Sequence, residues 1–498
     1  MSFKRLVLSF TFLAIFTMAV RVSVDTDTWW HLRAGEYILE QREIIRHDPF
    51  SLTRFGQPWI YPGWFAQILL YGTYKLLGLG GLNLFTAIMV VLAFACVWPL
   101  LDAPPLMRAS VLLLSATASG IYWSARPQII SFTLSGLFIF VLWRAKQGNQ
   151  RVLWVLPPIM ALWSNIHGGF AIGFLFIVCF LLGELLEAFS SWVREGIPPR
   201  EIWSVHRDWL LRLGIVGLAC AVAVSLNPHG PQMLVYPFKT VSIGVLRDYI
   251  QEWQSPNFHH LEVQPFLWLL LLLVITFARL WSEADWVSII LVAGFTYLSF
   301  LAARNIALFA LVVAPVLSKY GYRALLPYLK RIKKGTQVPV AIARILNLVL
   351  IVLMAFAALL KIVEPLRNET IQKAVSEQVP VDAVSQILED VPPGPMFNSY
   401  NWGGYVVWSM YPHYRSFVDG RTDLFDDETL NDYLKAWRAD SGWEQVIDQW
   451  DVQLVLLEVG APLAKSLAYR GWIISYEDDM AVVLQRPQHP QSIETQGN

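Results

Sequence analysis

Residues 339–363 read PVAIARILNLVLIVLMAFAALLKIV, a predominantly apolar run. This run is longer than the roughly 20 residues that a helix needs to cross a bilayer. The composition changes directly after it, because residues 364–498 carry many charges and prolines together with short alternating runs. The junction therefore predicts a membrane domain, residues 1–363, followed by a water-soluble α/β domain, residues 364–498.

The chain before this junction is a series of similar apolar stretches. Of the 498 residues, 55% are hydrophobic and 15% are charged, whereas soluble domains are about 25% charged. We therefore expect an α-helical polytopic membrane protein with about 11–12 apolar helices. Lys4 and Arg5 before the first core also fit a signal peptide, but no small-x-small cleavage site follows, so an uncleaved first helix is expected. The predicted cores are 6–24, 64–78, 82–101, 109–123, 129–143, 152–166, 168–190, 210–226, 265–281, 286–301, 305–318 and 339–363.

Charge and motif content exclude several classes of protein. The formal net charge is +0, so no basic field indicates a nucleic-acid partner. Cys96, Cys179 and Cys220 lie inside apolar runs and are predicted to be buried thiols, neither a disulfide framework nor a zinc site. No HExxH, CxxC, Walker or GxGxxG motif supports a zinc protease, a redox protein or a nucleotide-driven motor.

Loops rich in Lys and Arg predict the orientation of the membrane domain. They lie at the N-terminus and around 144–151, 194–207 and 319–334, and such loops are typically cytoplasmic. Three apolar stretches separate the first two outer motifs, and three full crossings would place these motifs on opposite sides of the membrane. We therefore expect one stretch, such as 64–78, to lie along the interface or to be re-entrant. The remaining polar motifs and the soluble domain then share the outer face; the motifs are DTDTWWHLRAG at 25–35, ARPQ at 125–128, NIHGGF at 165–170, NPHG at 227–230, EWQSP at 252–256 and ARN at 303–305.

Asp25 and Asp27 are the candidate acidic site. A paired carboxylate at a membrane surface can bind a divalent cation such as Mg²⁺ or Mn²⁺, or it can act as a general base toward an acceptor. Trp29 and Trp30 follow as expected interfacial anchors. Apolar residues then recur at helical spacing through residue 41, which predicts an amphipathic helix lying on the membrane.

Basic side chains supply the candidate phosphate-binding groups. Arg126 and Arg304 are expected at helix ends on the outer face, where a planar guanidinium can bind phosphate bidentately; snorkelling is the alternative. His167 and His229 are flanked by glycine or proline, which places them in turns. Three roles are open for them: structural hydrogen bonding, metal binding and proton transfer. His31 is a further candidate for contact with substrate. Because few charges fall near mid-span, the pattern favours chemistry at the membrane surface over transport through it.

A family resemblance rests on the order of these motifs. DTDTWWHLRAG, RPQ, WSNIHGGF, SLNPHG and ARN together resemble a bacterial, largely uncharacterised branch of the GT-C glycosyltransferases. The resemblance implies a membrane enzyme that takes sugars from polyprenyl-phosphate or polyprenyl-diphosphate carriers. It also implies the bacterial cytoplasmic membrane as location, with an extracytoplasmic soluble domain and an envelope glycan, lipid or protein as acceptor.

The tail carries an independent resemblance. FNSYNWGGYVVW at 397–408, FVDGRTDLFDD at 417–427 and WDVQLVLLE at 450–458 resemble the segment of Stt3-type oligosaccharyltransferases that holds a WWDYG motif. The resemblance implies acceptor binding by Asn401 and Trp402 and places Asp419 in the following turn. The W-W-D of that family is not kept. That family also carries an acidic pair in its second outer loop, where this chain has ARPQ. Metal dependence therefore does not follow from the resemblance.

The mechanism that the resemblance implies is displacement at the anomeric carbon. Asp27 or Asp25 deprotonates or orients the acceptor, and Arg126 and Arg304 stabilise the departing lipid phosphate. Two other functions stay open at this point: a flippase or transporter of lipid-linked glycans, and a non-catalytic scaffold of the envelope.

Overall fold

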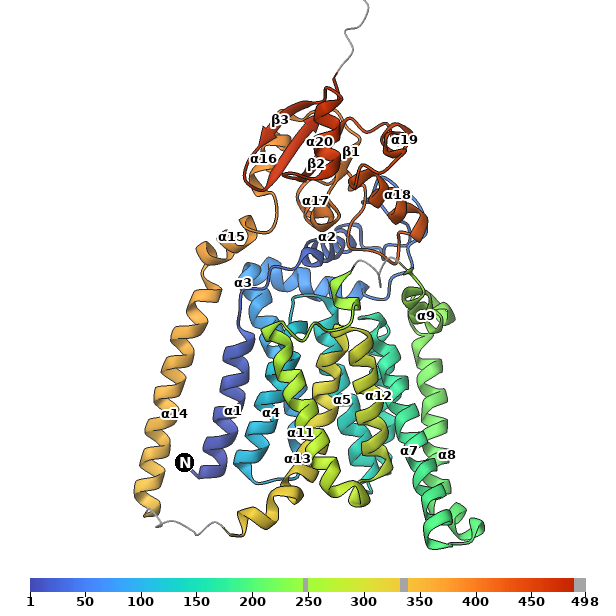
Figure 1. Ribbon diagram of the computed structural model, residues 1–498, viewed down its shortest axis with the longest axis vertical. Coiled ribbons are helices and arrows are strands. Elements are labelled where there is room, and N and C mark those ends of the chain that lie inside the picture. Colours follow the sequence, from blue (N-terminus) through green and yellow to red (C-terminus); the bar gives the residue numbers. More distant parts are fainter. Residues whose placement is uncertain (245–249, 332–338, 488–498) are drawn as a thin grey trace, which may run out of the picture. The chain divides into compact units, whose positions relative to one another are not determined.

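The computed structural model describes residues 1–244, 250–331 and 339–487 (Figure 1). The chain divides into two compact units, each built from two separate stretches of sequence. We call Met1–Ser23 with Pro62–Ile371 the helical unit, and Val24–Tyr61 with Gln372–Asn498 the sheet unit. This division differs from the predicted boundary at residue 363, because segment 24–61 packs with the C-terminal residues.

The helical unit contains helices at every predicted apolar core. The region after residue 318, which was expected to be a basic loop, continues as helix to Leu329. The helices are α1 (Phe3–Ala19), α3 (Trp64–Val97), α4 (Pro105–Ser119), α5 (Pro127–Lys146), α6 (Leu156–Trp163), α7 (Ala171–Glu195), α8 (Pro199–Val224), α9 (Tyr236–Val241), α11 (Gln264–Leu280), α12 (Trp286–Leu301), α13 (Ile306–Leu329) and α14 (Val340–Val363). Short 3₁₀ helices used below are η2 (Gly120–Tyr122), η4 (Gly168–Phe170), η5 (Gly230–Leu234), η6 (Gln251–Trp253) and η9 (Ala303–Asn305).

Several of these helices are long and apolar enough to cross a membrane. Within the described ranges, 6 segments meet that description by length and composition. The shorter α12 is also apolar. These helices confirm the prediction of a multi-pass membrane protein. The 6 segments are Trp64–Leu100, Pro127–Lys146, Gly168–Glu195, Leu261–Glu283, Ala303–Leu329 and Val340–Leu366.

Burial separates the central helix α13 from the peripheral helix α14. The apolar window of α13 is 83% buried, whereas that of α14 is only 6% buried. Figure 1 shows α14 at the edge of the helical unit beside α1, where Asn347 donates to the carbonyl of Met1 and Lys361 to that of Thr17. Exposing so much apolar surface to water is unfavourable, so α14 belongs in lipid.

Helix α3 bends at Gly78. The backbone there is non-helical, with φ 64° and ψ −163°, a conformation that is open mainly to glycine. Figure 1 shows the part before the bend crossing the end of the helix bundle, while the remainder runs along it. The stretch 64–78 is therefore a separate helical segment, as expected for a helix along the interface.

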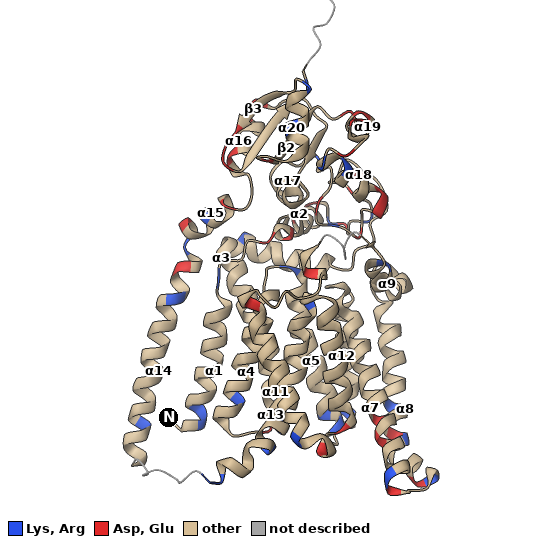
Figure 2. Ribbon diagram, viewed as in Figure 1, with Lys and Arg blue, Asp and Glu red and all other residues tan. Residues whose placement is uncertain are grey.

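Charged residues of the helical unit gather near the ends of its helices (Figure 2). The middle parts of the helices are drawn mainly tan, without Lys, Arg, Asp or Glu. This distribution agrees with the expectation that few charges fall near mid-span, where ionised groups are costly.

The sheet unit contains a mixed four-stranded sheet in the order β1-β2-β4-β3. Strand β1 is parallel to β2, and the other two pairings are antiparallel. The buried side chains of β2 and β4 form the centre of the core. Its elements are α2 (Thr26–Gln41), α16 (Val381–Asp390), β1 (Met396–Asn398), η11 (Tyr400–Trp402), α17 (Gly403–Ser409), α18 (Asp427–Trp437), α19 (Trp443–Gln449), β2 (Leu454–Glu458), α20 (Pro462–Tyr469), β3 (Ile473–Glu477) and β4 (Ala481–Gln485), while α15 (Asn368–Ser376) straddles the unit boundary.

Candidate functional site

Two arginines of the helical unit converge on one carboxylate. Arg126, directly before α5, donates from Nη2 to Oε2 of Glu252 at 2.8 Å. Arg304, in η9, lies with Nη1 at 3.1 Å from Oε1 of the same residue. The Arg304 guanidinium also stacks over the Trp253 ring at 4.5 Å, and its charge acts on the nearby hydroxyl of Tyr122. We call Tyr122, Arg126, His167, Glu252 and Arg304 the arginine cluster.

Electrostatics keep Glu252 ionised. Burial alone raises the pKa of this carboxyl, but the nearby Arg126 and Arg304 outweigh that effect and hold its pKa at about 2. A carboxylate with so low a pKa is a poor general base near neutral pH. Glu252 therefore acts in this arrangement as a counter-ion.

His167 lies beside the same two arginines as a neutral imidazole. Burial and the charges of Arg304 and Arg126 lower its pKa to about 3. Its Nδ1 accepts the backbone N–H of Gly169 at 3.0 Å and lies 3.0 Å from Oγ of Ser131. Because Nδ1 is an acceptor, the ring proton resides on Nε2.

The two turns that contain the predicted histidines share one network of amide hydrogen bonds. Asn227 donates to the carbonyl of Ser164 at 2.7 Å and to Oδ1 of Asn165 at 3.3 Å. Trp64 donates to the same Asn165 oxygen at 2.8 Å. The backbone N–H of His229 donates to Oδ1 of Asn227 at 2.9 Å. These contacts link the NIHGGF and NPHG motifs to the start of α3.

An apolar groove of about 480 Å³ lies between α11 and α12. The lining residues of the groove belong to the middle and the C-terminal half of α11 and to the middle of α12. Its lining residues are Leu270, Leu273, Val274, Phe277, Ala278, Trp281, Val292 and Thr296.

In the sheet unit, Asp25 and Asp27 lie at the N-terminus of α2. Asp25 is the N-cap, and its Oδ1 accepts the backbone N–H of Asp27 at 3.0 Å. Oδ1 of Asp27 accepts Nε1–H of Trp30 at 3.2 Å. A carboxylate at a helix N-terminus is favoured by the helix dipole, so both residues have a structural reason to be acidic in addition to any catalytic one.

The predicted amphipathic helix forms as α2, but its apolar face lies inside the sheet unit. Trp29 packs edge-on against Tyr405, with ring centroids 5.2 Å apart. Trp30 packs against Trp59 and lies 3.5 Å from the ring of His31. All three side chains of 29–31 are at most 5% exposed. The two tryptophans are thus core residues of this unit, where the sequence indicated interfacial anchors.

Close backbone approaches explain two glycines of the tail motifs. A Cβ atom at Gly404 would lie 2.3 Å from the carbonyl oxygen of Thr26, and one at Gly420 would lie 1.7 Å from Oδ1 of Asp27. Neither position leaves room for a side chain. Consequently the NWGGY and VDGRT motifs are held directly against the segment that bears the aspartates.

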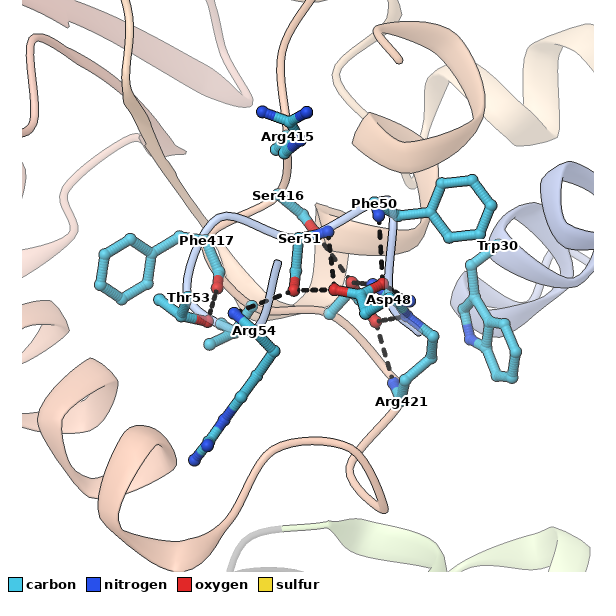
Figure 3. A network of polar contacts seen from close by, with 12 residues as sticks. Trp30, Asp48, Phe50, Ser51, Thr53, Arg54, Arg415, Ser416, Phe417 and Arg421 are labelled. Carbon is cyan, nitrogen blue, oxygen red and sulfur yellow. Dashed lines mark hydrogen bonds and ion pairs between the residues drawn. The ribbon is translucent and has the colours of Figure 1, made fainter. Parts of the chain in front are cut away.

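A buried ion-pair network ties segment 24–61 to the C-terminal residues (Figure 3). Arg421 donates from Nε and Nη2 to the two carboxylate oxygens of Asp419 at 2.8 and 2.7 Å, and from Nη1 to Asp48. Asp48 also accepts the backbone N–H of Ser51 at 3.0 Å, and Ser416 donates to Asp419 at 2.8 Å. Arg421 and Asp419 are 0% exposed and Asp48 is 1% exposed. Asp419, a predicted acceptor-binding residue, is therefore occupied in holding this loop.

Asn401 and Trp402 occupy different environments. Asn401 is exposed, whereas Trp402 is 4% exposed and donates from Nε1 to the carbonyl of Gln378 at 3.1 Å. The side chain of Asn401 is therefore accessible from outside the unit, whereas Trp402 supports the segment from inside.

No group of three or more His, Cys, Asp or Glu side chains converges like a metal site in the ranges that the structure describes. Asp25 and Asp27 offer two carboxylates, one of which caps a helix. Mg²⁺ is usually held by one or two carboxylates together with water and substrate phosphates, so this donor set fits such an ion in part.

Sequence reasoning missed Glu252, Asp48 and Arg421 as site or framework residues. Glu252 lies in the EWQSP motif quoted above. An acidic residue in an outer loop, on the same face as the arginine-containing motifs ARPQ and ARN, is a signal that could have identified it. Asp48 and Arg421 are 373 residues apart in sequence, and nothing local indicates that they pair.

Comparison with solved structures shows that the chain has the GT-C fold, the fold of polytopic membrane glycosyltransferases. One neighbour is the oligosaccharyltransferase AglB from Archaeoglobus fulgidus in complex with an inhibitory peptide and a dolichol-phosphate. Its TM-score is 0.51 at 13% identity, over 92% of this chain and 70% of that chain. Another is an Archaeoglobus fulgidus oligosaccharyltransferase tethered to an acceptor peptide with the NVT sequon, with TM-score 0.53 and 12% identity over 91% and 69%.

ArnT from Cupriavidus metallidurans in the apo state is also similar, with TM-score 0.44 and 14% identity over 96% of this chain and 97% of that chain. No family model matches the chain, and no characterised protein matches it in sequence. At these identities the likeness establishes the fold.

Proposed function

We propose that this protein is a membrane glycosyltransferase that moves a sugar or glycan from a polyprenyl-phosphate or polyprenyl-diphosphate carrier to an envelope acceptor on the extracytoplasmic face. The observation that carries the proposal is the convergence of Arg126 and Arg304 on one anion position in a chain with the GT-C fold. Paired guanidinium groups are suited to a phosphate, whose oxygens accept hydrogen bonds from both forks.

The donor phosphate is assigned to the arginine cluster. As the bond between the anomeric carbon and the phosphate oxygen breaks, its electron pair passes to the phosphate, and the two arginines stabilise the added charge. The apolar groove between α11 and α12 suits the isoprenoid tail, since it is lined by carbon-rich side chains of membrane helices.

The acceptor is assigned to the segment around Asp27. The carboxylate of Asp27 would orient the acceptor and take its proton as the new bond to the anomeric carbon forms. Asp25 shapes the N-terminus of α2, and exposed Asn401 is the accessible residue of the acceptor motif. One structural neighbour, AglB from Archaeoglobus fulgidus, was solved with an inhibitory peptide and a dolichol-phosphate, which supports a polyprenyl-phosphate carrier for this chain.

The test compares the lipid-linked and envelope glycans of a deletion strain by mass spectrometry. The deletion is complemented with wild-type protein, with Asp27→Asn or with Arg304→Ala, and Arg323→Ala serves as a surface control. A transferase requires that one sugar be missing and its lipid-linked donor accumulate in the deletion and in the first two variants, but not in the control.

Other outcomes of the same test identify the competing functions. If lipid-linked glycan accumulates while purified wild-type protein transfers no sugar from any carrier, transport explains the phenotype better. If Asp27→Asn and Arg304→Ala both restore every glycan, the proposed site is wrong and a scaffold role is favoured.

A further inference from the structure

Glu252 occupies the position between Arg126 and Arg304 in the way that a phosphodiester would. Each of its two oxygens faces a different guanidinium, at 2.8 and 3.1 Å. A phosphodiester likewise has two free oxygens and one negative charge. The carboxylate is therefore matched to such a group in both charge and hydrogen-bonding pattern.

Two helix N-termini lie beside this position and favour an anion there in addition to the two arginines. Arg126 is the N-cap of α5, a helix of 20 residues. Arg304 lies in η9, directly before α13, a helix of 24 residues. The N-terminal end of each helix adds partial positive charge.

The position of Glu252 argues against a role as base or as a purely structural partner. Its pKa of about 2 removes it from proton transfer near neutral pH. Its side chain is 31% exposed, more than either arginine. A partly exposed carboxylate on a loop can leave its partners at lower cost than a fully buried one such as Asp419.

We infer that Glu252 is an internal substitute for the donor phosphate: it occupies the Arg126–Arg304 site in the free protein and is displaced when a singly charged phosphodiester of a polyprenyl-phosphate sugar binds. This inference rests on the proposed function and narrows its donor class. A phosphodiester presents the same two free oxygens and the same single charge as the carboxylate that it replaces, whereas a diphosphate presents four free oxygens and a second negative charge.

Binding measurements on the full chain test the inference. Purified protein in detergent is titrated with farnesyl phosphoryl glucose, farnesyl diphosphoryl glucose and phosphatidylglycerol, and the complexes are measured by native mass spectrometry. The variants are Glu252→Gln, Arg304→Ala and, as a matched control, Glu262→Gln, whose side chain is 63% exposed and lies outside the cluster.

Wild-type protein is expected to bind the monophosphate probe more tightly than the diphosphate probe. Glu252→Gln removes the competitor and should tighten binding of the monophosphate probe by roughly tenfold or more, as expected when the competent state is populated below about a tenth. Its gain for the diphosphate probe should be larger, because the nearby carboxylate repels two negative charges more strongly than one. Arg304→Ala should weaken both, and Glu262→Gln should change neither.

Three outcomes overturn the inference and one overturns the function on which it rests. Unchanged or weaker binding by Glu252→Gln means that Glu252 does not compete, and preference of wild type for the diphosphate probe rejects the donor class. Equal binding of phosphatidylglycerol means that the site takes lipid phosphodiesters in general. If neither probe binds and Arg304→Ala behaves like wild type, the phosphate site itself is absent.

A second measurement uses wild-type protein alone and so does not depend on how Glu252→Gln folds. Ala303 donates its backbone N–H to the carbonyl of Gln254 at 2.9 Å, which joins η9 to the Glu252 segment. Displacement of Glu252 should increase hydrogen–deuterium exchange in residues 251–254 and at Ala303 when the monophosphate probe is added. Equal or stronger protection of this segment contradicts displacement.

Discussion

Arg304 is restrained on two sides before any ligand arrives. Glu252 lies on one edge of the guanidinium, and Trp253 covers its face at 4.5 Å. Restraint of this kind lowers the entropy that the side chain loses when it binds an anion. A residue prepared in this way contributes more to donor binding than its charge alone.

Arg304→Ala is expected to impair use of the donor more than use of the acceptor. Loss of a charge-assisted contact of about 1.5–3 kcal/mol predicts a fall in kcat/KM for the donor of roughly 10–100-fold. Steady-state kinetics with each substrate varied in turn measure the effect, and Arg323→Ala is the control. An equal fall for both substrates contradicts a specific role in phosphate binding.

His167→Asn is expected to reduce the sensitivity of the protein to acid. The native pKa is about 3 and the ordinary value is 6.5, so between these values the unfolded chain binds a proton that the native chain does not. Stability therefore falls as the pH drops from 6.5 toward 3. Asparagine can still accept the N–H of Gly169 without titrating.

The measurement is the melting temperature Tm of wild type, His167→Asn and the control His413→Asn between pH 7.5 and 5. The wild type and the control should lose Tm as the pH falls, and His167→Asn should lose on the order of 2 °C less. Parallel curves for all three proteins would show that His167 does not titrate differently on unfolding.

At the scale of elements, the contact between α2 and α17 positions the acidic segment. The two helices meet where the NWGGY motif has glycine and leaves no space for a Cβ atom beside Thr26. Trp29 packs against Tyr405 of α17 on the same contact. The aspartates at the start of α2 therefore depend on the packing of a helix that lies nearly 400 residues later.

Gly404→Ala is expected to destabilise the sheet unit by about 1–3 kcal/mol, because the methyl group would lie 2.3 Å from the carbonyl oxygen of Thr26. Transferase activity should fall with it, since α2 must shift. Chemical unfolding followed by tryptophan fluorescence gives the change. Gly214→Ala in α8, where a Cβ atom meets nothing within 4 Å, should leave both quantities near wild type.

At the scale of the whole molecule, the chain leaves the helical unit after α1 and contributes residues 24–61 to the sheet unit. It then forms the rest of the helical unit and enters the sheet unit again after residue 371. The Asp48–Arg421–Asp419 network holds the two contributions together within the sheet unit. Removing one member of a buried network leaves uncompensated charge, which is typically more costly than the network is stabilising.

Arg421→Met should destabilise the sheet unit by about 3–5 kcal/mol, since Asp48 and Asp419 would stay buried without a cation. Hydrogen–deuterium exchange of the full chain should rise in 24–61 and 372–487 and stay unchanged in the spanning helices. The surface pair Arg470–Glu444 provides the control, and Arg470→Met should cost less than about 1 kcal/mol. Exchange spread evenly over both units would contradict an independent sheet unit.

Hydropathy by itself determined the helices of the membrane part, because a spanning segment must be apolar over its whole length and satisfy its backbone internally. It also indicated the sheet of the tail, since strands such as β2 and β4 are short apolar runs. Arg126, Arg304 and His167 are three of the five predicted phosphate- or substrate-binding residues, the others being His31 and His229, and the structure brings these three into one cluster.

Only the tertiary structure decided which side chains share an environment. The sequence indicated Trp29 and Trp30 as interfacial anchors, but an amphipathic helix has the same pattern whether its apolar face meets lipid or protein. The pairing of Asp48 with Arg421 and the bridge of Glu252 between two arginines join residues far apart in the chain, and local sequence contains no information on such contacts. Periodicity reports local environment, whereas the meeting of distant charges depends on how the whole chain folds.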